Sequence, residues 1–138
     1  ALDLYEVLAE LDDEKGEFAY ARDKWSIVQM IRHLIDTDMV FTYRALYFCR
    51  NQGGELAGYD HEAWARESMA SELSLSLLNE EFMKGRQFLV RFYRGLSDKQ
   101  LAIIGKVEGK PTSVRSIPFI LSGHVLHHLN ILRERYLS

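Results

Sequence analysis

Two histidines four residues apart, His124 and His128, are the residues of this chain best placed to do chemistry. They lie in a segment with helical periodicity, where residues four apart stack one above the other on the same face. That face also carries the apolar residues of the segment, so both imidazoles are expected to point toward a core. A buried neutral imidazole costs free energy unless its nitrogens find partners. The pair is therefore either two hydrogen-bonded core histidines or two ligands of a divalent metal.

A third histidine, His33, favours the metal interpretation. It lies on another predicted helix at the margin of the apolar stripe, about 60° from Met30 on an ideal helical wheel. Three imidazoles from two facing helices could hold Zn²⁺ or Ni²⁺ with one or more positions left open, which is typical of a catalytic site. His127 projects about 60° from His124, so it could support the ligands or contact a helix, with a surface position as the alternative.

Two charged residues on the predicted helix of His33 are candidates for a role beside it. Asp36 lies three residues beyond His33 and could orient the second nitrogen of that ring, as metal-bound histidines usually require. An exposed, solvated position is the alternative for Asp36. Arg44 falls on the same side of the helix and could attract a substrate carboxylate, or form an ordinary ion pair.

Asp38 is expected to be buried, because an ideal wheel places it about 20° from Ile31, inside the apolar stripe. A buried carboxylate needs a partner. The candidates are His127, Arg135 or a water bound to the metal. A structural ion pair between helices is the alternative, and we favour it.

Several other kinds of site are absent from the sequence. The zincin motif needs Glu after its first His, where this chain has Val125. The di-iron bundles need Glu-x-x-His pairs, and the sequence contains none. It also lacks the Gly-x-Ser-x-Gly and Cys-x-x-Cys motifs, and its one cysteine, Cys49, is expected to serve packing. We expect His61, in a loop, to be solvated.

Four helices are expected to position these residues, and their ranges are residues 2–12, 26–50, 71–96 and 114–137. The second begins with a Ser-x-x-Gln capping box formed by Ser26 and Gln29. In the last, Pro118 is best tolerated in the first turn. No long period-2 run is present, although residues 103–114 could form a small hairpin around Glu108-Gly109.

The pattern predicts an all-α four-helix bundle with a long loop, residues 51–70, between the second and third helices. We expect residues 1–138 to form one domain, because a chain of 138 residues with 47% hydrophobic residues can bury a core without a structural metal. Within the long loop, Tyr59, Asp60 and Trp64 could shape a substrate pocket, although Trp64 is more simply explained by packing over the bundle end.

Composition argues against several partners. The net charge of -3 leaves no basic surplus for nucleic acid, and no uncharged stretch approaches the length of a membrane span. A single cysteine cannot form an intramolecular disulfide, which fits the reducing cytoplasm. We therefore expect a cytoplasmic protein with a small-molecule substrate and neither a nucleic-acid nor a membrane partner.

Three parts of the sequence together resemble the DinB-like metal-binding bundle proteins. They are residues 24–46, with Lys24-Trp25-Ser26-Ile27 and His33-Leu34-Ile35-Asp36-Thr37-Asp38; the loop string Tyr59-Asp60-His61-Glu62-Ala63-Trp64; and residues 123–137. The resemblance covers most of the chain from Tyr20 onward. The family often has Glu-Arg where this chain has Asp38-Met39, and the first helix is shorter than usual.

The resemblance implies that His33, His124 and His128 bind a divalent metal. It also implies a dimer, because many relatives form one. Characterised branches of the family include transferases and isomerases that use low-molecular-weight thiols, so a thiol cosubstrate is expected. The leading hypothesis is a metal-dependent thiol transferase or hydrolase that activates a thiol or water against a small electrophile. The alternative is a non-catalytic, stress-related dimer with a structural or vestigial metal site.

A homodimer is also expected from the last helix itself. Besides its inward stripe, that helix carries Phe119, Leu126, Leu129 and Leu137 on other sides. Such a helix must be covered nearly all round, by neighbouring helices or by a second subunit.

Overall fold

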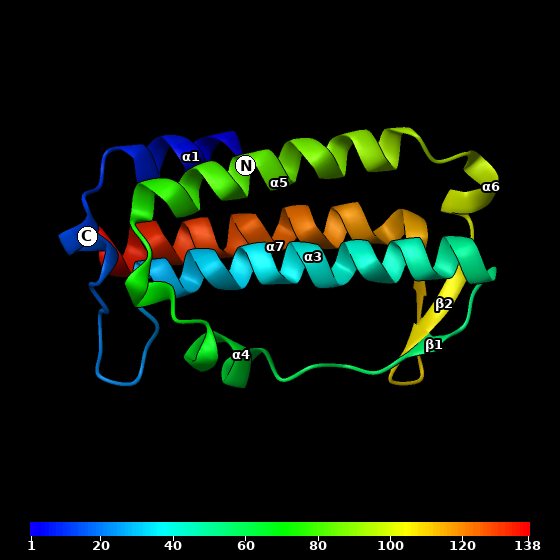
Figure 1. Ribbon diagram of the computed structural model, residues 1–138, viewed down its shortest axis with the longest axis horizontal. Coiled ribbons are helices and arrows are strands. Elements are labelled where there is room, and N and C mark those ends of the chain that lie inside the picture. Colours follow the sequence, from blue (N-terminus) through cyan, green and yellow to red (C-terminus); the bar gives the residue numbers. More distant parts are fainter.

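A computed structural model describes residues 1–138, and it confirms the predicted four-helix bundle. The bundle helices are α1 (Leu2–Ala9), α3 (Ile27–Asn51), α5 (Leu75–Arg94) and α7 (Ile117–Ile131), the last continuing as a π-helical turn over Leu132–Tyr136. In Figure 1, α3 and α5 run in one direction while α1 and α7 run in the other. The short α1 covers only part of the bundle's length.

Local sequence signals explain where the long helices begin. The predicted capping box is present, since Ser26 accepts a hydrogen bond from the amide of Gln29 and the Gln29 side chain accepts one from the amide of Ser26. Ser74 caps α5 in the same way, with its side chain accepting from the amide of Leu77. Pro118 lies in the first turn of α7, as predicted.

The long connection between α3 and α5 follows from their parallel directions, because the chain must return along the bundle before it can start α5. This connection contains β1 (Glu55–Leu56), α4 (His61–Glu67) and a short 3-10 turn, Ala70–Glu72. The sequence pattern predicts a loop without such elements here. Asp60 begins α4 by accepting a hydrogen bond from the amide of Ala63.

A small sheet lies beside α3 near the end of the bundle away from the C-terminus (Figure 1). The predicted hairpin is confirmed as antiparallel strands β2 (Ile104–Val107) and β3 (Lys110–Ser113), and β1 adds to β2 in parallel. Two one-turn helices, α2 (Asp13–Gly16) and α6 (Asp98–Leu101), complete the fold. No helix combines the length and the apolar character that a membrane crossing requires.

The core consists of two apolar clusters separated by a polar layer. The larger cluster includes residues of α3 up to Ile35 and of α7 from Val125 onward. The smaller cluster includes residues of α3 from Ala45 onward and of α7 up to Leu121. Asp38 lies between these two parts of α3, and His124 lies between these two parts of α7. Arg86 lies between the residues of α5 that belong to the larger cluster and the one that belongs to the smaller cluster. The polar residues therefore occupy a common level of the bundle.

Asp38 is buried as predicted, and its partner is Arg86 rather than His127 or Arg135. Arg86 Nε lies 2.8 Å from Asp38 Oδ2. The same guanidinium donates a hydrogen bond through Nη2 to the carbonyl oxygen of Leu121, at 3.2 Å. Arg86 thus links three helices across the polar layer, and the pairing is the interhelical one that we favoured.

Candidate metal centre

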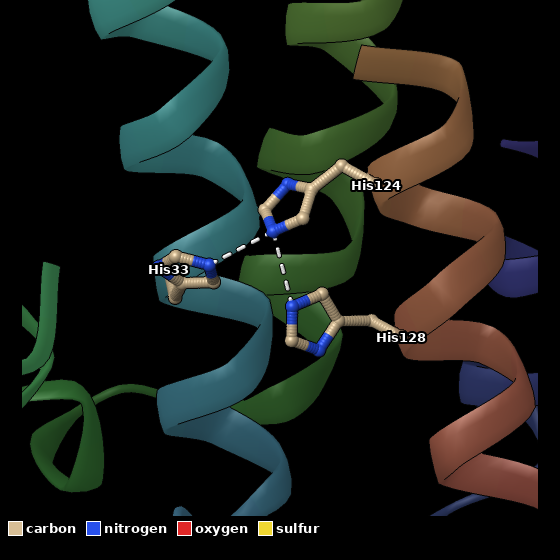
Figure 2. Close-up of side chains that lie close together, drawn as sticks. All are labelled: His33, His124 and His128. Carbon is tan, nitrogen blue, oxygen red and sulfur yellow. Dashed lines mark hydrogen bonds between the residues drawn. The ribbon is translucent and has the colours of Figure 1, made fainter. Parts of the chain in front are cut away.

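The structure brings His33, His124 and His128 together inside the bundle. Figure 2 shows the three rings pointing toward one another, the first from α3 and the other two from α7. The Nε2 atom of His124 lies 3.0 Å from Nε2 of His33 and 3.1 Å from Nε2 of His128. One ring nitrogen from each residue lies within 4.8 Å of the other two. Ligand nitrogens grouped this closely could be shared by one metal ion.

The neighbouring chain holds these rings in place. His33 and His128 are buried, whereas His124 is half-buried and lies nearer the solvent. Trp25, immediately before the capping box of α3, packs against both buried rings, with ring centroids 4.7 Å from His33 and 6.3 Å from His128. Fixed orientation of this kind reduces the entropy that metal binding would otherwise cost.

Burial keeps the three imidazoles neutral. It lowers the pKa of His33 and His124 to about 4 and that of His128 to about 3, and repulsion from neighbouring imidazoles acts in the same direction. The positive charge of Arg86 also lowers the pKa of His124. Neutral imidazoles have free lone pairs at physiological pH, which is the state that coordinates a metal.

Hydrogen bonds among the three rings cannot satisfy all of their nitrogens. A ring nitrogen carries either one hydrogen or one lone pair, so Nε2 of His124 can make only one good hydrogen bond with its two neighbours. Its other nitrogen, Nδ1, is buried without a hydrogen-bond partner. A divalent cation would accept a lone pair from each Nε2 atom at once. The donor set therefore fits a divalent metal with three protein ligands and an open side.

The three histidines line a cavity of about 560 Å³. Its walls come from α3, α7, the connection before α4, the start of α4 and the β2–β3 turn, and include Thr37, Phe41, Arg44, Tyr59, Glu108, Ile120 and His127. The hydroxyl groups of Tyr59 and Thr37 lie 2.9 Å apart and form a hydrogen bond. This bond joins the long connection to α3 beside the cavity. Tyr59 lines the cavity, as predicted from the sequence for a residue that could shape a pocket.

The other candidate residues lie in different places. Asp36 does not orient His33, because its Oδ1 accepts a hydrogen bond from Nε of Arg32, at 2.9 Å. Arg44 is buried on the cavity wall. His127 is exposed on the cavity rim, with its ring centroid 5.2 Å from that of His128. Asp36 is half-exposed and paired with Arg32, and no contact joins it to His33.

Two further positions, His61 and Trp64, differ from what sequence reasoning predicted, whereas Cys49 agrees with it. His61 is the first residue of α4 and lines the cavity, with its ring centroid 5.7 Å from that of His33, so its assignment to simple solvation was incomplete. The capping residue Asp60 was the available signal for this helix. Trp64 lies on Tyr59, half exposed, rather than over the bundle end. Cys49 is buried, as expected for a packing role, and burial raises the pKa of its thiol.

Comparisons with known proteins agree with this architecture. YfiT from Bacillus subtilis, described as "a probable metal-dependent hydrolase with an unusual four-helix bundle topology", matches with a TM-score of 0.74 at 17% sequence identity. The match covers 94% of this chain and 82% of that one, and at this identity it shows a shared fold. No curated protein matches the sequence. A family model of the DinB superfamily matches residues 3–132, nearly the whole length, and the chain therefore belongs to the DinB superfamily.

Proposed function

We propose that this protein is a metal-dependent enzyme in which His33, His124 and His128 hold a divalent ion, Zn²⁺ or Ni²⁺, and a small-molecule electrophile reacts beside it. The observation that most supports this proposal is that three neutral imidazoles bring their Nε2 atoms together at the wall of an open cavity. The description of YfiT as a probable metal-dependent hydrolase supports a metal in this fold.

The residues of the chain bind and position, and none of them supplies the nucleophile. The only thiol, Cys49, is buried with a raised pKa, outside the cavity lining. A divalent metal at the three histidines would lower the pKa of a coordinated water or low-molecular-weight thiol, and so make a nucleophile available at neutral pH. Trp25 fixes the ligand rings, and the Tyr59–Thr37 hydrogen bond fixes the wall beside them. We place the enzyme in the cytoplasm, because a thiol cosubstrate requires a reducing compartment.

Metal analysis of protein purified without an affinity tag tests the site. We expect about one equivalent of Zn²⁺ or Ni²⁺ per chain for the unmodified protein, and a loss of at least about tenfold in affinity for His128→Ala. The matched control is His127→Ala on the next position of the same helix, which should retain the metal. A folded His128→Ala protein that keeps its full equivalent would overturn the assignment.

Turnover is tested with the metal-loaded and metal-free forms side by side. Activated esters report hydrolysis, and a panel of small thiols with a generic electrophile reports thiol transfer. We expect a metal-dependent rate with one of these two substrate sets. A protein that binds metal but shows no rate above the metal-free form with either set would instead be a non-catalytic member of the family.

A further inference from the structure

Arg44 lines the same cavity as the three histidines but lies at its other end. It is eleven residues beyond His33 on α3 and retains only 8% of its surface exposure. Its guanidinium lies over the ring of Phe41, 4.5 Å from the centroid, and 5.7 Å from the centroid of the Tyr59 ring. These aromatic contacts fix the direction of the side chain.

No carboxylate of the chain pairs with Arg44. The ion pairs of the structure involve other arginine, lysine and histidine side chains. Glu108 lines the same cavity and its charge acts on Arg44, but at a separation greater than an ion pair. An arginine stays charged even where burial lowers its pKa, and a buried unpaired charge is costly. An anion that entered the cavity would remove this cost.

The spacing along α3 sets the length of such an anion. Eleven residues of α-helix separate the Cα atoms of His33 and Arg44 by about 16 Å, at 1.5 Å per residue. Both side chains lean toward the N-terminus of α3, so their ends stay roughly 15 Å apart, and the contacts at the two ends take up roughly 5 Å of this, which leaves about 10 Å for the ligand itself. A ligand that touches both ends must therefore be extended.

We propose that Arg44 is a substrate-binding residue that selects extended small molecules bearing a carboxylate about 10 Å from the group that reacts at the histidines. This inference rests on the proposed function, because it assumes that the reacting group meets a metal on the three imidazoles. Arginine suits the task, since its planar guanidinium can bind a carboxylate through two parallel hydrogen bonds. A short acid bound at the histidines would not reach it.

Binding of bifunctional thiols to the cobalt-loaded protein tests the proposal. Cobalt in a three-histidine site has a visible spectrum that changes when a thiolate binds, so binding is read without turnover. The probes are mercaptooctanoate and mercaptoacetate, each with the thiol at the chain end opposite the carboxylate, and their neutral counterparts mercaptooctanol and mercaptoethanol. We expect mercaptooctanoate to bind about tenfold more tightly than mercaptooctanol. Mercaptoacetate should gain no affinity over mercaptoethanol from Arg44, because it is too short to reach the guanidinium.

Three variants locate the source of the preference. Arg44→Gln should reduce it to about onefold without changing the cobalt spectrum, and Arg44→Lys should retain part of it because the charge remains. Glu108→Gln should increase it, because a competing carboxylate is removed. Circular dichroism confirms that each variant is folded.

The two ideas fail in different ways. A protein that does not take up cobalt at the histidines refutes the proposed function. If cobalt and thiols bind but the unmodified protein shows no preference for mercaptooctanoate, or Arg44→Gln keeps that preference, then the assignment of Arg44 is wrong while the metal site stands. If a variant fails to fold, the two long probes still test the proposal in the unmodified protein, because equal binding of mercaptooctanoate and mercaptooctanol would refute it.

Discussion

Arg86 on α5 reaches across the bundle to Asp38 on α3, with 2.8 Å between Nε and Oδ2. The pair lies in the polar layer between the two apolar clusters, at the level of His124. Burial raises the pKa of Asp38 to about 6 despite the guanidinium beside it, because desolvation of the carboxylate outweighs the attraction. A pair held in such a place adds little net stability, but each partner depends on the other.

Breaking this pair should destabilise the protein strongly. We expect Arg86→Met to reduce the free energy of unfolding by about 3–5 kcal/mol, because it leaves the Asp38 carboxylate buried and uncompensated. The double variant Asp38→Leu with Arg86→Met should recover most of that loss. Urea unfolding of the metal-free protein measures both effects. The exposed pair of Lys84 and Glu80 is the control, and Lys84→Met should change stability by less than about 1 kcal/mol.

The comparison has a clear negative outcome. If the double variant recovers none of the stability lost in Arg86→Met, Asp38 and Arg86 are not coupled, and the short distance between them carries no energetic meaning.

Acid should destabilise the metal-free protein through its histidines. The pKa values of His33 and His124 are about 4 and that of His128 about 3 in the folded chain, against 6.5 when unfolded. Between these values the unfolded state binds more protons, so stability falls as the pH drops through 6.5 and continues to fall toward 4. Asp38 acts in the opposite direction, because its raised pKa lets the folded state take up a proton first.

Urea midpoints measured across this pH window check the sign. Replacing His128 with Leu removes one of the three shifted groups and should flatten the dependence. A metal-free protein whose midpoint is constant from neutral pH to pH 4, or rises on acidification, would show that the imidazoles are not buried together in solution.

The long helices and the histidine pair were predictable because their signals are local. The capping box at Ser26 and the 3.6-residue apolar period of α3 depend only on neighbouring residues, as does the stacking of His124 on His128. His33 was harder to place, since a helical wheel puts it only at the stripe margin. Its meeting with His124, 91 residues away, depends on how two helices pack.

The partners of the charged residues were not predictable in the same way. A helical wheel shows that Asp38 faces inward, but it cannot show which residue of another helix faces it, and Arg86 was not among the candidate partners. Asp36 was assigned to His33 by sequence distance, whereas Arg32 one turn earlier competes for it. The parallel pairing of β1 with β2 involves only two residues of β1, too few to leave a pattern.

Because the sheet packs closely against α3, a larger residue in place of Gly105 should destabilise the protein. A Cβ built there would overlap the ring of Phe48, which is fully buried in the smaller apolar cluster. We expect Gly105→Ala to destabilise the protein by about 1–3 kcal/mol, as overpacking typically does. Gly85→Ala is the matched control, because its Cβ would meet nothing and a helical alanine should stabilise by about 0.5–1 kcal/mol. Equal effects in thermal or urea unfolding would contradict the contact.

The outer face of α7 predicts where a second subunit binds. Phe119 and Leu126 are seven residues apart on one face and remain 75% and 56% exposed, while Leu129 is buried within the chain. We expect a homodimer formed through this face, and Leu126→Glu should yield monomers in sedimentation experiments because it places a charge in an apolar interface. Phe88→Glu, at an exposed apolar residue of α5, is the control that should stay dimeric. Dissociation by Phe88→Glu alone would instead place the interface on the α5 side, and a monomeric unmodified protein would refute the expectation of a dimer.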